Sequence, residues 1–122
     1  GRLGVVLPLS FAERMRRDNG GEVVASDEDW FLFPIADTTD RKRLARTANH
    51  IERETALARS WHGFPPGAVA IANNGGGDLL VFLPDVADPT RLAPAVLAWR
   101  HEGGELEVVA AGFEELEGEG DR

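Results

Sequence analysis

The chain has 122 residues, a formal net charge of −8, 43% hydrophobic and 28% charged residues, and no cysteine. This length suits one domain, and the composition is that of a globular protein rather than a disordered one. The lack of cysteine excludes disulfides, thiolate metal sites and cysteine nucleophiles. No apolar run approaches the ~20 residues that cross a bilayer, so we expect a cytoplasmic protein without a membrane partner.

The charge is divided unevenly along the chain. Residues 1–60 hold ten acidic and ten basic side chains, whereas residues 61–122 hold eleven acidic and only three basic ones. The whole negative excess therefore lies in the second half. Such a surface repels phosphate backbones, so we expect no nucleic acid partner, and a basic protein is the better candidate. The alternative is that the acidic charge serves only solubility.

Two helices and two short strands are predicted in the first half. A helix over residues 8–18 begins near a proline and stops at the Asn-Gly-Gly of residues 19–21. Strands over 22–25 and 30–34 flank an acidic turn, and a proline ends the second one. The longest predicted helix covers residues 40–60, where apolar residues recur at steps of three and four.

The second half of the chain reads as two hairpins. Apolar runs within residues 68–83 flank a glycine-rich turn in which we expect Gly76 or Gly77 to have a positive φ. A second hairpin is predicted over 96–110, followed by a closing helical turn near residue 113. The order of these elements predicts an α+β domain over residues 1–117, mainly an antiparallel sheet with helices packed on one side, and a flexible acidic tail over 118–122.

No catalytic or metal-binding pattern emerges from the residues. The Asn-Asn-Gly-Gly-Gly-Asp of residues 73–78 precedes a strand and carries negative charge, so a tight turn is expected rather than a phosphate loop. The three histidines lack the H-x-x-x-H spacing of a zinc site, and no serine lies in G-x-S-x-G. We therefore expect no enzyme, no cofactor and no metal. Trp30, Trp61 and Trp99 fit either a ligand pocket or the core, and core packing is expected for at least two of them.

Three stretches of the chain resemble the SUKH superfamily, in its Smi/Knr-like branch. They are LGVVLPLSFAERMRRDNGG, FPPGAVAIANNGGGDLLVFLP and VLAWRHEGGELEVVAAGFEELE, and in order and spacing they cover most of the chain. The resemblance implies an antiparallel sheet with helices on one side and no catalytic triad. Its shared positions are expected in turns and core: Asn19, Gly20, Gly21, Gly77, Asp78, Trp99 and Phe113.

The same resemblance gives the expected function. Many bacterial members are similar to immunity proteins that bind and neutralise a cognate toxin, often a nuclease, whereas eukaryotic relatives resemble regulatory scaffolds. We therefore expect a protein-binding module that occludes a toxin, with a regulatory scaffold as the alternative. Carboxylates are the expected contacts, because the phosphate-binding groove of a nuclease is positive. The candidate partner-binding residues form two sets: Asp27, Glu28, Asp29, Asp85 and Asp88, or a subset of these close in space, and alternatively Glu102, Glu105 and Glu107.

Overall fold

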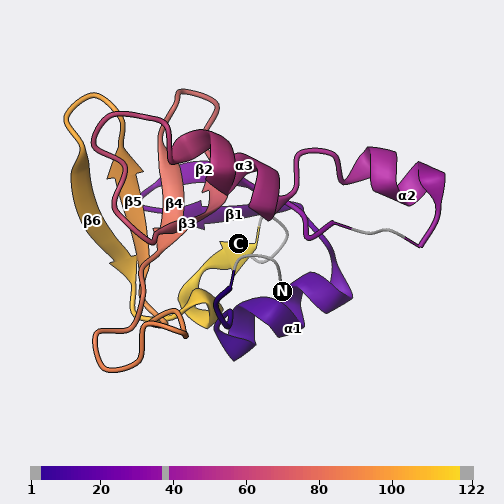
Figure 1. Cartoon of the computed structure of the whole chain (residues 1–122), viewed down its shortest axis with the longest axis horizontal. Coiled ribbons are helices and arrows are strands. Elements are labelled where there is room, and N and C mark those ends of the chain that lie inside the picture. The colour runs from indigo at the N-terminus through magenta and orange to yellow at the C-terminus, as the bar shows by residue number, and fades with distance from the viewer. Residues whose placement is uncertain (1–3, 37–38, 119–122) are drawn as a thin grey trace.

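The computed structural model describes residues 4–36 and 39–118, and within these it has three α-helices, one 3-10 helix and seven strands (Figure 1). The helices are α1 (Leu9–Arg17), α2 (Arg41–Arg46), α3 (Ile51–Ala58) and the 3-10 helix η1 (Phe113–Glu115). The strands are β1 (Glu22–Ala25), β2 (Glu28–Leu32), β3 (Val69–Asn73), β4 (Leu79–Phe82), β5 (Val96–Arg100), β6 (Glu105–Ala110) and β7 (Glu117–Gly118).

All seven strands belong to one antiparallel sheet, in the order β6-β5-β4-β3-β2-β1-β7. The predicted α+β class and the joining of both hairpins in one sheet are confirmed. The two central strands β3 and β4 carry almost only buried apolar side chains, whereas β6 at the edge leaves most of its side chains exposed. A central strand is covered on both faces, and its sequence is therefore apolar throughout rather than alternating.

The first hairpin turns more tightly than predicted. Its turn is confined to Ser26 and Asp27, which have φ of 53° and 60°. Two successive positive φ angles are typical of the two-residue turn whose twist matches that of the flanking strands. Strand β2 consequently begins at Glu28, two residues before the predicted start, and a half-buried carboxylate lies on the sheet itself.

The sheet is strongly curled. Four strands separate β1 from β6, yet the hydroxyl of Ser26 after β1 lies 3.3 Å from Glu107 Oε1 on β6. Register shifts between Ala70 and Ala72 and between Val96 and Leu97 accompany this curvature, as bulges increase strand twist. The sheet therefore has a concave face. The β3–β4 and β5–β6 turns lie at one end of it (Figure 1), and hydrogen bonds from Ser26 to Glu107 and from Asn74 to Glu28 bring the first hairpin to the same end.

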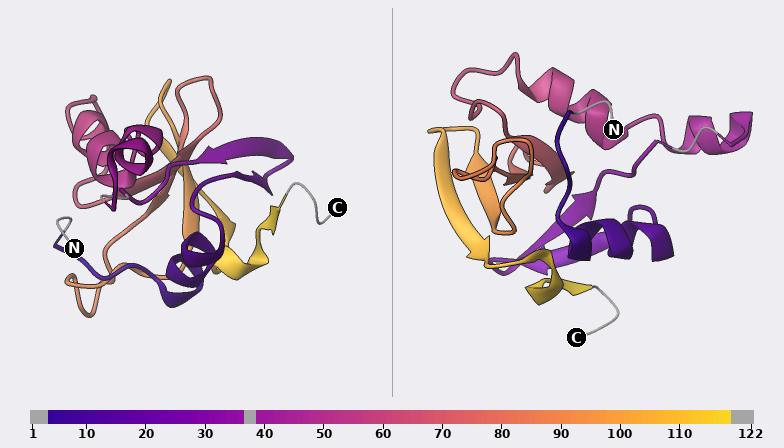
Figure 2. Two further views of the ribbon diagram at one scale, coloured as in Figure 1. Left: turned by 90° about the vertical axis from the view of Figure 1, so that its right-hand side faces the viewer. Right: turned by 60° about the horizontal axis from the view of Figure 1, so that its bottom comes forward.

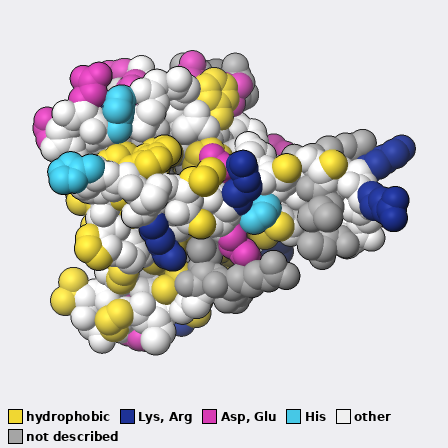
Figure 3. Space-filling view, turned by 45° about the horizontal axis from the view of Figure 1, so that its top comes forward, with side chains coloured by type: hydrophobic (Ala, Val, Ile, Leu, Met, Phe, Trp, Pro, Cys, Tyr) yellow, Lys and Arg dark blue, Asp and Glu magenta, His cyan; other side chains and the backbone are white. Residues whose placement is uncertain are grey.

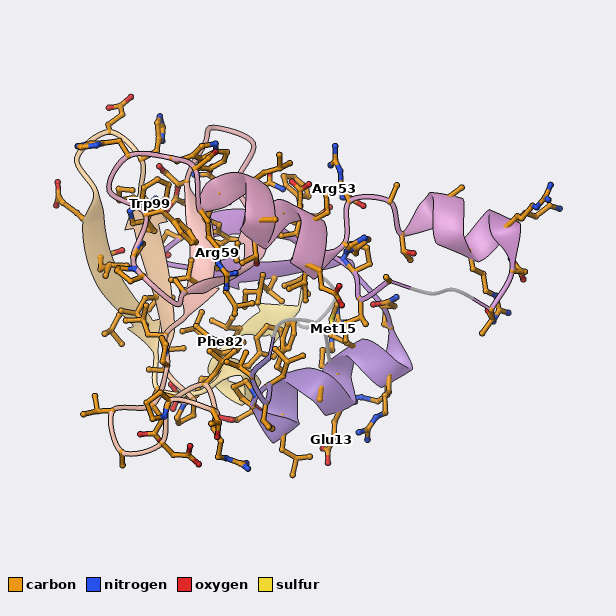
Figure 4. The ribbon with its side chains drawn as sticks, in the orientation of Figure 1. Glu13, Met15, Arg53, Arg59, Phe82 and Trp99 are labelled. Carbon is orange, nitrogen blue, oxygen red and sulfur yellow. The ribbon has the colours of Figure 1, made fainter. Side chains whose placement is uncertain are left out.

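Helix α1 lies against the opposite end of the concave face. Its buried residues are Phe11 and Met15, four positions apart on one side of the helix. The Phe11 ring packs edge-on against Phe82 at 5.4 Å and Phe113 at 4.9 Å between ring centroids. Figure 4 shows Met15 and Phe82 pointing into the space between α1 and the sheet, whereas Glu13 points outward. Burying each phenylalanine stabilises the fold by about 2 kcal/mol.

The predicted helix over 40–60 is two helices, because the chain is extended at His50. There the imidazole Nδ1 accepts the backbone N–H of Arg53 at 3.2 Å, so His50 is the N-cap of α3. The backbone N–H of Ile51, the residue after His50, donates to the carbonyl oxygen of Pro34 at 2.9 Å. These two bonds fix a new helix start where the periodicity of the sequence indicated continuity. The side chain of Leu44 in the predicted stripe lies outside the described residues.

The helices also divide between the two faces of the sheet instead of sharing one. Leu79 and Trp99 are register partners on one face, and Phe82, three residues on from Leu79, therefore points to the other. Phe11 of α1 packs on Phe82, whereas Trp61, three residues after the end of α3, stacks on Trp99. Figure 2 (right) shows α3 and α1 on opposite sides of the strands. The central strands β3 and β4 are apolar on both faces, so each face needs a cover.

The end of the chain pairs with the sheet as far as Gly118. β7 joins the free edge of β1, with Glu117 opposite Val24 and Gly118 opposite Val23. The tail predicted over 118–122 otherwise lies outside the described residues.

Candidate functional site

The ends of four strands bring a polar network together around Arg100, the last residue of β5. Its guanidinium lies 2.7 Å from Glu28 on β2, 3.1 Å from Asp78 before β4 and 3.4 Å from Glu107 on β6. All four side chains lie on the concave face of the curled sheet, which is why β2 and β6 can share one cation. The Arg100 guanidinium also lies over the Trp30 ring, 5.6 Å from its centroid.

Asn74 links this network to the glycine-rich turn between β3 and β4. Its amide nitrogen donates to Glu28 at 3.2 Å and to Asp78 at 3.1 Å. Its amide oxygen accepts the backbone N–H groups of Gly76 at 2.9 Å and Asp78 at 3.3 Å. Within this turn Gly77 has φ of +101°, which confirms the predicted positive angle, and Gly75 has +82°. The turn is therefore held by side chains that also position the acids.

Asp78 and His101 form a second close pair of ionisable groups at this end of the sheet, as close as Arg100 and Glu28. The ring Nδ1 of His101 lies 2.7 Å from Asp78 Oδ1, which also accepts the His101 backbone N–H at 3.1 Å. Partial burial alone raises the pKa of the Asp78 carboxyl. The hydrogen bonds from His101, Arg100 and Asn74 outweigh it and lower that pKa from 3.8 to about 2. Asp78 is therefore an anion throughout the physiological range.

The pKa values of Glu28 and Arg100 are also shifted so that each side chain keeps its charge. The hydrogen bond from Arg100 lowers the pKa of Glu28, and the bond to Glu28 raises the pKa of Arg100 in return. Both side chains are about two-thirds covered, at 34% and 27% exposed. Every charge here has a partner of opposite sign, so the network fixes the relative positions of the strand ends.

Two adjoining depressions meet at His101. One, of about 400 Å³, is lined by aromatic rings and a glycine: Trp61, His62, Gly77, Trp99 and His101. The other, of about 510 Å³, is polar and is lined by Gly76, Asp78, Arg100, His101, Glu102, Gly103 and Glu105. We call this end of the molecule the tip surface, comprising Asp27, Glu28, Trp61, His62, Asp78, His101, Glu102, Glu105 and Glu107. Figure 3 shows acidic side chains gathered beside histidines and hydrophobic side chains at its upper left.

A profile of the SMI1 / KNR4 family (SUKH-1) matches residues 1–118. The chain belongs to this family. No curated protein and no solved structure matches it. The predicted resemblance is thereby confirmed over nearly the whole chain. The match concerns the family of this SUKH-1 domain alone.

The structure divides the first predicted set of contact residues of the SUKH-1 domain. Asp27 and Glu28 lie at the hairpin turns, and Asp29 follows on the other face of β2. Asp85 and Asp88 lie in the loop between β4 and β5, which is at the opposite end of these strands (Figure 1). There they hold the loop instead, since Asp85 accepts the N–H of Ala87 and Asp88 accepts that of Thr90.

The second predicted set, Glu102, Glu105 and Glu107, lies at the same end of the sheet as Asp27 and Glu28. Glu102 and Glu105 line the polar depression, and Glu107 accepts hydrogen bonds from Arg100 and Ser26. The structure therefore brings Asp27 and Glu28 together with the acids of the β5–β6 hairpin. Whether these carboxylates contact a partner stays a prediction.

Sequence reasoning missed the centre of the tip surface. Arg100, Asn74 and His101 were not among the candidate residues, although Arg100 and His101 end a predicted strand and Asn74 lies in the predicted turn. One signal was present: pairing the two predicted hairpins side by side sets Leu79 opposite Trp99, and hence Asp78 beside Arg100. The approach of Glu28 and Glu107 depends on the curl of the whole sheet, for which the sequence offers no local pattern.

Two other features of the SUKH-1 domain stand apart from the tip surface. A largely aliphatic cavity of about 520 Å³ lies between α1, α3 and the segment before α1, with Arg16, Glu52 and Arg91 among its lining. Among residues 4–36 and 39–118, no three His, Asp or Glu side chains are grouped to hold a metal ion. Over the same residues, no helix has the length and apolar character needed to span a membrane.

Proposed function

We propose that this SUKH-1 domain is a non-enzymatic protein-binding module, an immunity protein that binds and neutralises a cognate toxin with a basic surface. The observation that carries the proposal is the tip surface, where exposed carboxylates and the exposed Trp61 line two adjoining depressions that meet at His101. Charge complementarity of this kind speeds association with a basic partner, while a central aromatic residue supplies binding energy.

The surroundings of His101 support binding rather than catalysis. Its Nδ1 and Asp78 form a pair that could orient a general base. However, none of the residues described as lining the two depressions is a serine, threonine or cysteine that such a base would activate. Asp78 is engaged with Arg100 and Asn74 as well, so its carboxylate serves the packing of the strand ends.

Neutralising a nuclease requires only that its groove be covered. The carboxylates of Glu102, Glu105 and Glu107 would take the place of substrate phosphates in a basic groove. Such a role places the domain in the cytoplasm of the bacterium that makes the toxin.

The test uses the genes that flank the gene of this domain. Each flanking product is expressed under induction in a bacterial host, alone and together with the SUKH-1 domain. We expect one product to arrest growth, the domain to restore growth, and the two proteins to purify as one complex. Continued arrest in the presence of soluble, folded domain would refute the proposal. A stable complex with a harmless neighbour would instead favour a regulatory scaffold.

A further inference from the structure

The aromatic depression of the tip surface has a rigid floor and an open platform. Trp61 stacks on Trp99 with ring centroids 6.0 Å apart and planes inclined by 23°. Phe64 packs edge-on against Trp99 at 5.4 Å, and the Trp99 indole N–H donates to the Gly63 carbonyl at 3.2 Å. Trp99 is 1% exposed, whereas Trp61 remains 43% exposed. The Trp61 ring is therefore held in place while much of it faces solvent.

His101 forms one wall of this depression in a fixed orientation. A Cβ on Gly77 would lie 3.0 Å from the His101 ring, so the ring packs directly on the glycine backbone. Asp78 engages Nδ1 at 2.7 Å, and Nε2 lies 3.9 Å from Glu102 Oε1. In the neutral ring, an Nδ1–H donated to Asp78 leaves Nε2 as a hydrogen-bond acceptor. In that neutral tautomer the wall presents an acceptor nitrogen beside the Glu102 carboxylate.

The adjoining polar depression adds negative charge. It is lined by the carboxylates of Asp78, Glu102 and Glu105 against the single guanidinium of Arg100. That guanidinium is already bound to Glu28 and Asp78, while the Glu102 side chain is 89% exposed. A ligand entering beside Trp61 therefore meets an aromatic ring, an acceptor nitrogen and unneutralised carboxylate charge.

We propose that this depression is a subsite for one arginine side chain of the basic partner. The inference rests on the proposed function, since it names the group that such a partner would insert. A planar guanidinium stacks on the Trp61 ring and donates N–H groups in a fork to Glu102 and to His101 Nε2. A lysine ammonium offers a point charge without the plane, and an anion is repelled by the carboxylates.

The chain already contains the same combination of groups within the partly exposed polar network around Arg100. The Arg100 guanidinium lies over the Trp30 ring and is bound by Glu28 at 2.7 Å. The subsite presents a tryptophan and a carboxylate without the cation. Its volume of about 400 Å³ suits a single side chain.

The experiment uses the intact domain and needs no toxin. N-acetyl-arginine amide is titrated into the domain, and the indole and imidazole resonances are followed by NMR. We expect saturable shifts at Trp61 and His101, binding about threefold weaker for N-acetyl-lysine amide, and no measurable binding for the uncharged N-acetyl-citrulline amide. Glu102→Gln should weaken arginine binding while its spectrum elsewhere stays that of the folded domain.

Two aromatic substitutions supply the matched comparison. Trp61→Leu should weaken binding of N-acetyl-arginine amide by at least about threefold, whereas Phe31→Leu, at a 44% exposed ring on β2, should leave it unchanged. Equal effects of both variants, equal binding of the citrulline compound, or no saturable shift would overturn the subsite. Because growth protection is measured separately, a domain that neutralises its toxin yet binds no arginine would refute this inference and leave the proposed function standing.

Discussion

Asp78 is the residue on which most of the tip surface converges. Each of its carboxylate oxygens accepts two hydrogen bonds, one pair from His101 and one pair from Arg100 and Asn74. It is only 17% exposed, so these bonds are partly shielded from water. The same residue was read from the sequence as a turn acid that opposes phosphate binding. Its carboxylate does lie in the β3–β4 turn, but it accepts hydrogen bonds from Arg100 and His101 of the β5–β6 hairpin.

The lowered pKa of Asp78 predicts how stability depends on pH. Because the folded-state pKa of about 2 lies below the value of 3.8 for the free group, the contribution is present above pH 3.8 and is lost as pH falls toward 2. We expect Asp78→Asn to lower the free energy of unfolding by about 1–2 kcal/mol at pH 6, and the difference to shrink below pH 4. Urea unfolding at pH 6, 4 and 3 measures it. Glu102→Gln, at an exposed carboxylate, is the control. A difference in free energy of unfolding between wild type and Asp78→Asn that is the same at all three pH values would contradict the lowered pKa of Asp78.

The elements of the fold differ in how far the sequence predicts them. Helix α1 and the β3–β4 and β5–β6 hairpins are specified locally, by apolar spacing between glycine or proline boundaries. The break before α3 is not, because it depends on the Pro34 carbonyl meeting Ile51, which are far apart in sequence. The extra residues of β2 were missed for a similar reason. Glu28 is tolerated on the concave face only because Arg100 lies opposite it.

The β3–β4 turn provides a matched pair of glycines. Gly77 has φ of +101° and its missing Cβ would contact the His101 ring, whereas Gly76 lacks a left-handed φ and a Cβ there would meet only the Asn74 side chain at 3.5 Å. Gly77→Ala should therefore lower the free energy of unfolding by about 1–3 kcal/mol, with Gly77→Val at the upper end. Gly76→Ala should change it by less than about 0.5 kcal/mol. Urea unfolding of the three variants decides, and equal losses at both glycines would show that backbone strain at residue 77 is not the cause.

At the scale of the molecule, the curl of the sheet decides which charges become neighbours. The sequence placed the negative excess after residue 60, and hence the predicted partner surface joined Asp85 and Asp88 to the first hairpin. In an antiparallel sheet successive connections alternate between the two ends of the strands. Asp85 and Asp88 lie in the β4–β5 connection, and therefore at the other end of the sheet from the β3–β4 and β5–β6 turns. The tip surface instead unites Asp27 and Glu28 from the neutral half with the acids of the β5–β6 hairpin. Position along the chain alone could not have indicated this.

The opposite ends of the molecule allow the role of the tip charge to be separated from that of net charge. Two double variants change the net charge equally. One combines Glu102→Lys with Glu105→Lys and alters the tip surface, and the other combines Asp85→Lys with Asp88→Lys at the opposite end. With the partner identified by growth protection, we expect association of the wild type to slow about tenfold or more between 20 and 200 mM salt, because steering is screened beyond about 10 Å. The tip pair should slow association more than it speeds dissociation, as charges at the rim of an interface do, while the opposite pair has little effect on either rate. Stopped-flow binding across the salt series measures both rates. Salt-independent association, or equal effects of the two pairs, would exclude electrostatic recognition by the tip surface and leave recognition by shape.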